Sequence, residues 1–137
     1  MTLNLTVAIA APGNMGAGVG RRLVEHGVTV LTSLAGRSPD SVARAQAAGM
    51  AAVEPERLVE AEFVLSILPP AQALAFAEKT VQWIAGRAFK PVFVDCNAVS
   101  PDTVRAIGAV IARADIPFID AAIIGLPPKP GQPGPRF

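Results

Sequence analysis

The chain has 137 residues, of which 51% are hydrophobic and 17% charged, and its formal net charge at pH 7 is +1. This length is typical of one domain with a substantial hydrophobic core. The 12 basic and 11 acidic side chains form no block of like charge, which argues against nucleic acid or an anionic membrane as a partner. The single cysteine, Cys96, excludes an internal disulfide and a cysteine-based metal site. We therefore expect no metal ion and a reducing, cytoplasmic environment.

The apolar start of the chain, residues 3–11, has no preceding Lys or Arg and runs directly into a glycine turn. We interpret it as a strand rather than as a secretion signal. No apolar run approaches the roughly 20 residues that a membrane-spanning helix needs, so we expect a soluble protein.

The first predicted unit is a strand, a turn and a helix. Residues 5–10 form a short, nearly continuous apolar run, which is typical of a strand covered on both faces. Apolar residues recur at helical spacing over residues 15–25, and His26-Gly27 gives that helix a C-terminal stop. Residues 28–32 predict the second strand.

The same alternation continues to residue 120. Ser-Pro pairs at positions 38 and 100 are typical of helix starts, and Pro69-Pro70 ends a strongly apolar strand. The remaining strands are predicted over residues 51–53, 63–68, 92–95 and 117–120, and the remaining helices over residues 38–48, 55–60, 71–85 and 101–113. Strands joined through helices imply right-handed crossovers. The expected fold is therefore α/β, a Rossmann-type doubly wound parallel sheet of about six strands with helices on both faces.

The predicted domain covers residues 1–126, and a Pro-rich tail covers residues 127–137. The tail holds five prolines, which neither continue a helix nor donate to a sheet. We expect it to be an extended surface segment that resembles a linker.

The turn after the first strand carries the chemistry. The Rossmann fingerprint G-x-G-x-x-G needs glycines for a tight turn, for the approach of a pyrophosphate and for close helix–strand packing. Its second and third glycines are present as Gly13 and Gly16, and Ala11 replaces the first. The position before a helix N-terminus, with its free N–H groups, favours dinucleotide binding over a nucleotide-free turn. The cofactor-binding residues predicted from this turn are Pro12, Gly13, Asn14, Met15 and Gly16.

The end of the second strand favours NADP over NAD. An NAD-specific domain places Asp or Glu there to hold the ribose hydroxyls, and this chain has neither. Ser33, Arg37 and Ser38 instead offer hydroxyls and a guanidinium to a 2′-phosphate. The alternative is that Arg37 is an ordinary solvated arginine whose charge Asp40 partly neutralises.

Taken together, the motifs resemble the NAD(P)-binding domain of the 6-phosphogluconate dehydrogenase-like and β-hydroxyacid dehydrogenase superfamily. The resemblance rests on residues 13–16 (GNMG), 68–70 (LPP), 94–97 (VDCN) with Pro101, and 120–125 (DAAIIG). It implies that the Asn-Met loop covers the pyrophosphate and nicotinamide. It also implies that Leu68, Pro69 and Pro70 line the cofactor cleft, and that Arg37 with Ser38 grips the 2′-phosphate.

Two departures from that family affect its chemistry. The substrate loop, usually Ser-Gly-Gly, reads Ile124-Gly125-Leu126, so only Gly125 is carried over as a substrate-binding residue. The family's catalytic lysine and its companion asparagine lie in a second, all-helical domain, which these residues do not include and through which the family forms dimers. Lys129 lies in the tail, so we assign it no catalytic role.

Three further residues are candidates for function. His26, the only histidine, ends a helix, and we interpret it as a capping or surface residue rather than a base. Cys96 follows a strand that should face the cofactor crevice, but packing is the favoured role. Asn97 is a candidate cofactor- and substrate-binding residue because a strand-end amide can hydrogen-bond either molecule. The chain has no tyrosine, which excludes the Tyr-Lys chemistry of short-chain dehydrogenases.

Two functions from different classes remain open from the sequence. The first is the NADP(H)-binding half of an oxidoreductase whose full form transfers a hydride to or from a small hydroxy acid or related carbonyl compound. We expect the chain alone to be inactive, because it supplies no residue to take the hydroxyl proton. The second is a non-catalytic NADP(H)-binding module.

Overall fold

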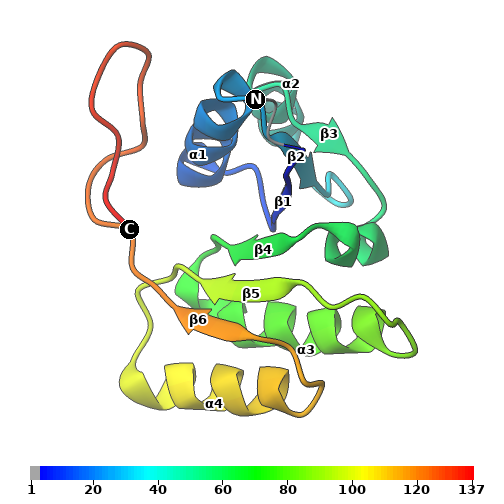
Figure 1. The fold of residues 1–137 in the computed structure, drawn as a ribbon. Helices are drawn as coiled ribbons and strands as arrows, with labels where there is room; N and C mark the ends of the chain where they lie inside the picture. Colours follow the sequence, from blue (N-terminus) through cyan, green and yellow to red (C-terminus); the bar gives the residue numbers. More distant parts are fainter. Residues whose placement is uncertain (1–3) are drawn as a thin grey trace.

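The computed structural model describes residues 4–137, so the first three residues of the predicted domain lie outside the described part. It contains a six-stranded sheet in the order β3-β2-β1-β4-β5-β6, and all the strand pairs are parallel (Figure 1). The strands are β1 (Thr6–Ile9), β2 (Thr29–Thr32), β3 (Ala51–Ala52), β4 (Phe63–Ser66), β5 (Val92–Asp95) and β6 (Phe118–Asp120). The helices are α1 (Asn14–Glu25), α2 (Pro39–Ala47), α3 (Ala73–Ile84) and α4 (Pro101–Ala112), with short 3₁₀ helices η1 (Pro55–Glu60) and η2 (Pro70–Gln72). The expected Rossmann-type α/β fold is confirmed.

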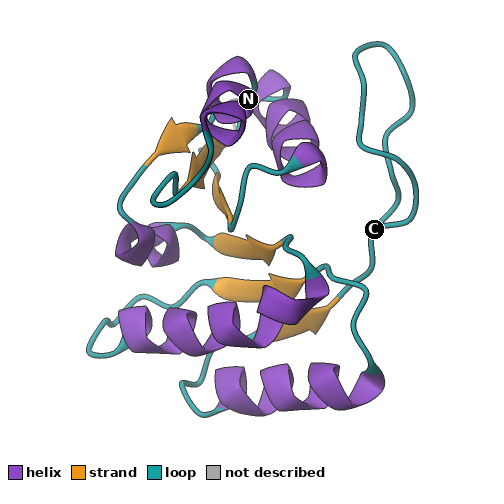
Figure 2. Ribbon diagram, turned by 180° about the vertical axis from the view of Figure 1, so that it is seen from behind, coloured by secondary structure: helices purple, strands orange, loops and turns teal. Residues whose placement is uncertain are grey.

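Helices cover the two faces of the sheet because alternate strand residues point to opposite sides. In β1, Val7 and Ile9 belong to one buried cluster with residues of α1 and α2, whereas Ala8 belongs to a second cluster with residues of α3 and α4. Figures 1 and 2 show α3 and α4 side by side, apart from α1 and α2. Burial on both faces explains why the strands have continuous rather than alternating apolar sequences.

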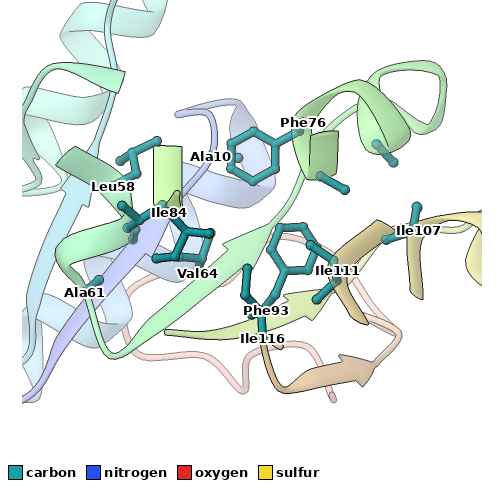
Figure 3. Packing of buried hydrophobic residues seen from close by; sticks show 14 residues of the cluster. Ala10, Leu58, Ala61, Val64, Phe76, Ile84, Phe93, Ile107, Ile111 and Ile116 are labelled. Atoms are coloured by element: carbon teal, nitrogen blue, oxygen red, sulfur yellow. The ribbon is translucent and has the colours of Figure 1, made fainter. Parts of the chain in front are cut away.

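The larger cluster is organised around Phe93 of β5, which is fully buried. Its ring centroid lies 5.9 Å from that of Phe76 on α3 and 6.3 Å from that of Phe118 on β6. Figure 3 shows Phe93 between the side chains of the helices and the sheet, with Ile111 and Ile116 beside it. These contacts fix α3 and α4 on this half of the sheet.

The predicted helix starts at the two Ser-Pro pairs are confirmed. Ser38 caps α2, since its Oγ accepts the Ser41 N–H at 3.2 Å, and Ser100 caps α4 by accepting the Thr103 N–H at 3.2 Å. Each serine satisfies a backbone donor that the helix leaves unpaired, and the following proline needs no partner.

The segment around the two prolines differs from the prediction. The fourth strand ends at Ser66 rather than residue 68, and residues 70–72 form a 3₁₀ turn before α3 begins. Pro69 has extended backbone angles and neither proline has an N–H, so the ladder stops and the helix starts late.

The tail also differs from the expected extended linker, because it folds back. Ile124 and Arg136 exchange two backbone hydrogen bonds of 2.8 Å in an antiparallel bridge. Pro128 is buried, and its carbonyl accepts a 2.8 Å hydrogen bond from an Arg21 guanidinium nitrogen on α1. A Cβ at Gly18 would lie 2.9 Å from Pro128 Cδ, so the small residue makes room for this contact. The loop runs beside α1 in Figure 1.

None of the helices formed within residues 4–137 combines the length and apolar character required to cross a bilayer.

Gly16 permits the close approach of α1 to β1, and we predict that Gly16→Ala destabilises the fold. An added Cβ would collide with the Ala11 carbonyl oxygen and lie 3.2 Å from Ile9 Cγ2. The expected loss is about 1–3 kcal/mol of unfolding free energy, which outweighs the helix propensity of alanine. Urea unfolding followed by Trp83 fluorescence measures it.

The matched control is Gly108→Ala in α4, where the nearest neighbour of an added Cβ is Phe118 Cε1 at 3.4 Å. This variant should be unchanged or stabilised by up to about 1 kcal/mol. Equal effects at both glycines would contradict the packing argument.

Candidate functional site

The turn from β1 into α1 exposes unpaired backbone donors. Gly13 occupies the N-cap position, and no side chain caps the helix. The Ala17 N–H bonds to the Gly13 carbonyl at 2.8 Å, which leaves the N–H groups of residues 14–16 without helical carbonyl partners. Such donors, together with the helix dipole, favour an anion at this end of α1.

Gly13 leaves open space at the same point. Apart from Gly13 itself and its two chain neighbours, no atom of the described residues lies within 4 Å of a Cβ built there, in contrast to the crowded Gly16. One glycine of the motif therefore serves the helix–strand contact, and the other leaves the mouth of the turn accessible.

A pocket of about 290 Å³ lies over this turn. It joins the carboxyl ends of β1 and β4, where the strand order reverses and where ligands of such sheets bind. The lining residues are Ala11, Pro12, Gly13, Asn14, Met15, Gly16, Arg37, Ser41, Ile67, Leu68 and Pro69. No Asp or Glu of the described chain belongs to that lining, and Arg37 is its one charged member. We call it the glycine pocket.

A second pocket, of about 280 Å³, shares Arg37 and Leu68 with the glycine pocket. Its polar side chains are all hydrogen-bond donors or carry donor groups, namely Arg37, Gln72 and Lys79. The other walls are apolar and come from Ala10, Leu68, Ala75 and Phe76. The two pockets are therefore adjacent, and Arg37 and Leu68 lie at their common boundary.

The two serines predicted beside Arg37 bond to nearby residues. Ser33 is buried, and its Oγ accepts the Ala35 N–H at 3.4 Å. Ser38 Oγ caps α2 and donates to Ser41 Oγ at 3.2 Å. Neither serine lines the glycine pocket, and neither does Pro70.

Ser41 and Arg44 were missed by the sequence reasoning. Arg44 Nε donates to the Pro12 carbonyl at 3.1 Å, and its Nη2 donates to Ser41 Oγ at 3.0 Å. These bonds attach α2 to the glycine turn. Ser41 and Arg44 are three positions apart and therefore share one face of the predicted helix, but nothing local indicated that this face meets the turn.

Asn97 lies outside the glycine pocket and faces inward. Its side-chain Oδ1 accepts the Leu68 N–H at 2.8 Å, and its Nδ2 donates to Ser66 Oγ at 3.0 Å. It also lines a pocket of about 440 Å³ with Asp120 and the start of α4. Gly125, the predicted substrate-loop residue, is exposed, has a φ of 127° and lies next to the Ile124 bridge.

Two other candidate residues are explained by packing and capping. His26 ends α1, and its Nδ1 lies 2.8 Å from the Arg22 carbonyl oxygen, which supports the capping interpretation. Cys96 is buried, and burial, with a smaller contribution from the charge of Asp95, raises the pKa of its thiol to about 12. The thiol is protonated at neutral pH, as expected for a packing residue.

A pocket of about 380 Å³ between α1 and the tail has almost wholly apolar walls. They comprise Val19, Arg22, Leu23, Leu65, Pro128, Gly134, Pro135 and Phe137. Without convergent polar groups it lacks the chemistry of the glycine pocket.

Asp95, at the carboxyl end of β5, is a buried carboxyl group. Its Oδ1 accepts the Asn97 N–H at 2.9 Å, whereas its buried Oδ2 has no hydrogen-bond partner among residues 4–137. Burial raises the pKa of this carboxyl, hydrogen bonds from Asn97 oppose the rise, and neighbouring Asp120 adds to it.

The raised pKa predicts a loss of stability with pH. As pH rises, Asp95 of the unfolded chain, with an ordinary pKa near 3.8, deprotonates at a lower pH than Asp95 of the folded chain. The contribution of protonated Asp95 to the free energy of unfolding is therefore fully present below pH 3.8. The contribution is lost as pH rises through the folded pKa, because deprotonation then favours the unfolded chain. We predict that Asp95→Asn removes this loss, so its stability relative to the parent chain increases with pH above about 4.

Urea unfolding across a pH series checks this prediction. The control is Asp102→Asn, an exposed carboxylate paired with Arg105 at the surface. An unchanged pH dependence in Asp95→Asn would show that Asp95 carries no raised pKa.

Both the sequence and the fold of the chain match known proteins. Over residues 6–129 the sequence matches the family described as the NAD-binding domain of 6-phosphogluconate dehydrogenase. No curated protein matches the chain in sequence.

Among solved structures, one similar protein is the conserved protein MTH1747, which is described as structurally similar to 3-hydroxyacid dehydrogenases. Its sequence is 36% identical to this chain, and the TM-score is 0.77. The match covers 88% of this chain and 44% of that protein. Mycobacterium tuberculosis 3-hydroxyisobutyrate dehydrogenase, in a structure with L-serine, is 26% identical with a TM-score of 0.75, covering 90% and 42%.

An imine reductase from Myxococcus stipitatus in complex with NADP+ shares the fold at 17% identity, with a TM-score of 0.68 and coverage of 90% and 42%. The chain thus spans less than half the length of each of these solved proteins.

Proposed function

Because the chain belongs to the family of the NAD-binding domain of 6-phosphogluconate dehydrogenase, we propose that it binds NADP(H) in preference to NAD(H). The observation that carries this proposal is the composition of the glycine pocket, where Arg37 supplies a guanidinium and no described carboxylate faces it. An NAD site needs an acceptor for the ribose 2′-hydroxyl, whereas a 2′-phosphate needs donors.

The glycine pocket suits the pyrophosphate. The unpaired N–H groups at the start of α1 provide donors, and Gly13 leaves space for a phosphate to approach the backbone. Arg44 Nε donates to the Pro12 carbonyl, which restrains the turn that precedes those donors.

The second pocket suits the adenosine end of the cofactor. Leu68, Ala75 and Phe76 provide apolar surface for a flat base, while Gln72 and Lys79 offer donors to its ring nitrogens. Arg37, which lines both pockets, is then placed between base and pyrophosphate, where the ribose carries its 2′-phosphate. Ser41, which lines the glycine pocket, offers a further hydroxyl beside Arg37.

We further propose that the domain serves an oxidoreductase that acts on a small hydroxy acid or a related carbonyl compound. The bound nicotinamide would supply or accept the hydride, and this domain's task would be to orient it. Hydroxyacid dehydrogenase similarity among the solved neighbours supports this substrate class. Asn97 stays a candidate substrate-side residue because it lines a pocket with Asp120 at the carboxyl ends of β5 and β6. Gly125, which follows β6 beside the Ile124 bridge, stays a candidate from the sequence alone.

The preference for NADP(H) is tested with Arg37→Ala. We predict that the parent chain binds NADPH about tenfold or more tightly than NADH, and that the substitution removes this difference by weakening NADPH alone. Calorimetric titration with both cofactors measures the four dissociation constants.

Arg87→Ala is the matched control, because Arg87 is also exposed but lies between α3 and the start of β5 and lines neither pocket. It should leave both affinities unchanged. Equal binding of NADPH and NADH by the parent chain would contradict the proposed specificity while leaving dinucleotide binding intact.

The position of the pyrophosphate is tested with Gly13→Val. We expect a folded protein, since the side chain meets open space, but a loss of affinity for both cofactors of about a hundredfold or more. Circular dichroism and urea unfolding verify the fold, and titration measures binding. Unchanged affinity in the folded variant would place the dinucleotide elsewhere.

A further inference from the structure

The wall formed by Leu68 and Pro69, at the boundary of the two pockets, has few backbone N–H groups that can form hydrogen bonds. Leu68 lines both the glycine pocket and the second pocket, and Pro69 extends the first. Pro69 and Pro70 have no N–H groups, so the Leu68 N–H is the last donor before the 3₁₀ turn. That donor reaches the Asn97 side chain rather than a neighbouring strand.

The orientation of the Asn97 amide follows from this bond. The Leu68 N–H only donates, so the oxygen of the amide must face it, at 2.8 Å. The nitrogen of the amide then faces Ser66 Oγ, at 3.0 Å. Asn97 as a whole residue is 8% exposed, and its Oδ1 already accepts a hydrogen bond from the protein.

Asn97 is itself fixed by the sheet. Its backbone N–H donates to Asp95 Oδ1 at 2.9 Å, and the Cys96 N–H continues the ladder to the Ser66 carbonyl at 3.1 Å. The side-chain amide of Asn97 therefore links the segments that follow β4 and β5, beyond the last backbone hydrogen bond between the two strands.

We propose that Asn97 is a positioning residue that holds the Leu68–Pro69 wall of the cofactor pocket through its Oδ1, and that it makes no direct hydrogen bond to the cofactor. This inference rests on the proposed cofactor binding at the glycine pocket. It predicts that Asn97 affects NADPH and NADH equally, because both would contact the same wall.

The test compares two substitutions at one position. Asn97→Ala removes the acceptor and should weaken NADPH and NADH by the same factor, about tenfold. Asn97→Asp keeps an acceptor for Leu68 but loses the amide donor, and it should bind both cofactors within about threefold of the parent chain. A direct Nδ2–cofactor bond would instead make Asn97→Asp as weak as Asn97→Ala, and that result would overturn the inference.

Ser66→Ala is the structural control. It removes the partner of Nδ2 and leaves the Leu68 bond in place, so unfolding free energy should fall while both dissociation constants stay within about twofold. Urea unfolding of every variant separates stability from affinity. If Asn97→Ala does not fold, the affinity of Asn97→Asp still decides between the two roles.

The outcomes for the parent chain separate this inference from the proposed function. Failure of the parent chain to bind either cofactor overturns both. Binding by the parent chain with unchanged affinity in Asn97→Ala overturns the positioning role alone. A selective loss of NADPH in Asn97→Ala would also overturn it, because a wall common to both cofactors does not discriminate between them.

Discussion

The contact between α1 and β1 at Gly16 is the constraint on which the rest of the site depends. No side chain fits between the helix and the Ala11 carbonyl, so the helix starts directly over the end of its strand. This closeness directs the unpaired N–H groups of the first turn into the opening between β1 and β4. Arg44 then attaches the neighbouring helix to the same turn, and the pocket follows from these contacts.

Basic and acidic side chains lie near different strands at the carboxyl ends of the sheet. Arg37 and Arg44 lie on the β1–β2 side with Lys79 beside the adjoining pocket, whereas Asp95 and Asp120 end neighbouring strands on the other side. A ligand with phosphates at one end and a less charged group at the other suits this division. Burial disfavours the charged form of Asp95, whose Oδ2 has no hydrogen-bond partner among residues 4–137.

The sequence predicted those parts of the fold and site that depend on local signals. Apolar runs such as residues 63–66 identify strands, Ser38 and Ser100 identify helix starts, and Gly13 with Gly16 identifies the turn. The parts it missed depend on pairs far apart in the chain. Arg44 meets Pro12 across 32 positions, Asn97 meets Leu68 across 29, and Arg21 meets Pro128 across 107. Such contacts depend on how elements pack, which periodicity does not encode.

The paired prolines also have a consequence for observing this wall in solution. Residues 69 and 70 carry no amide hydrogens, so hydrogen–deuterium exchange cannot report on them directly. The amide hydrogen of Leu68, held by Asn97, precedes them immediately. Its exchange rate is therefore a single-site measure of how often this side of the pocket opens, separate from global unfolding of the sheet.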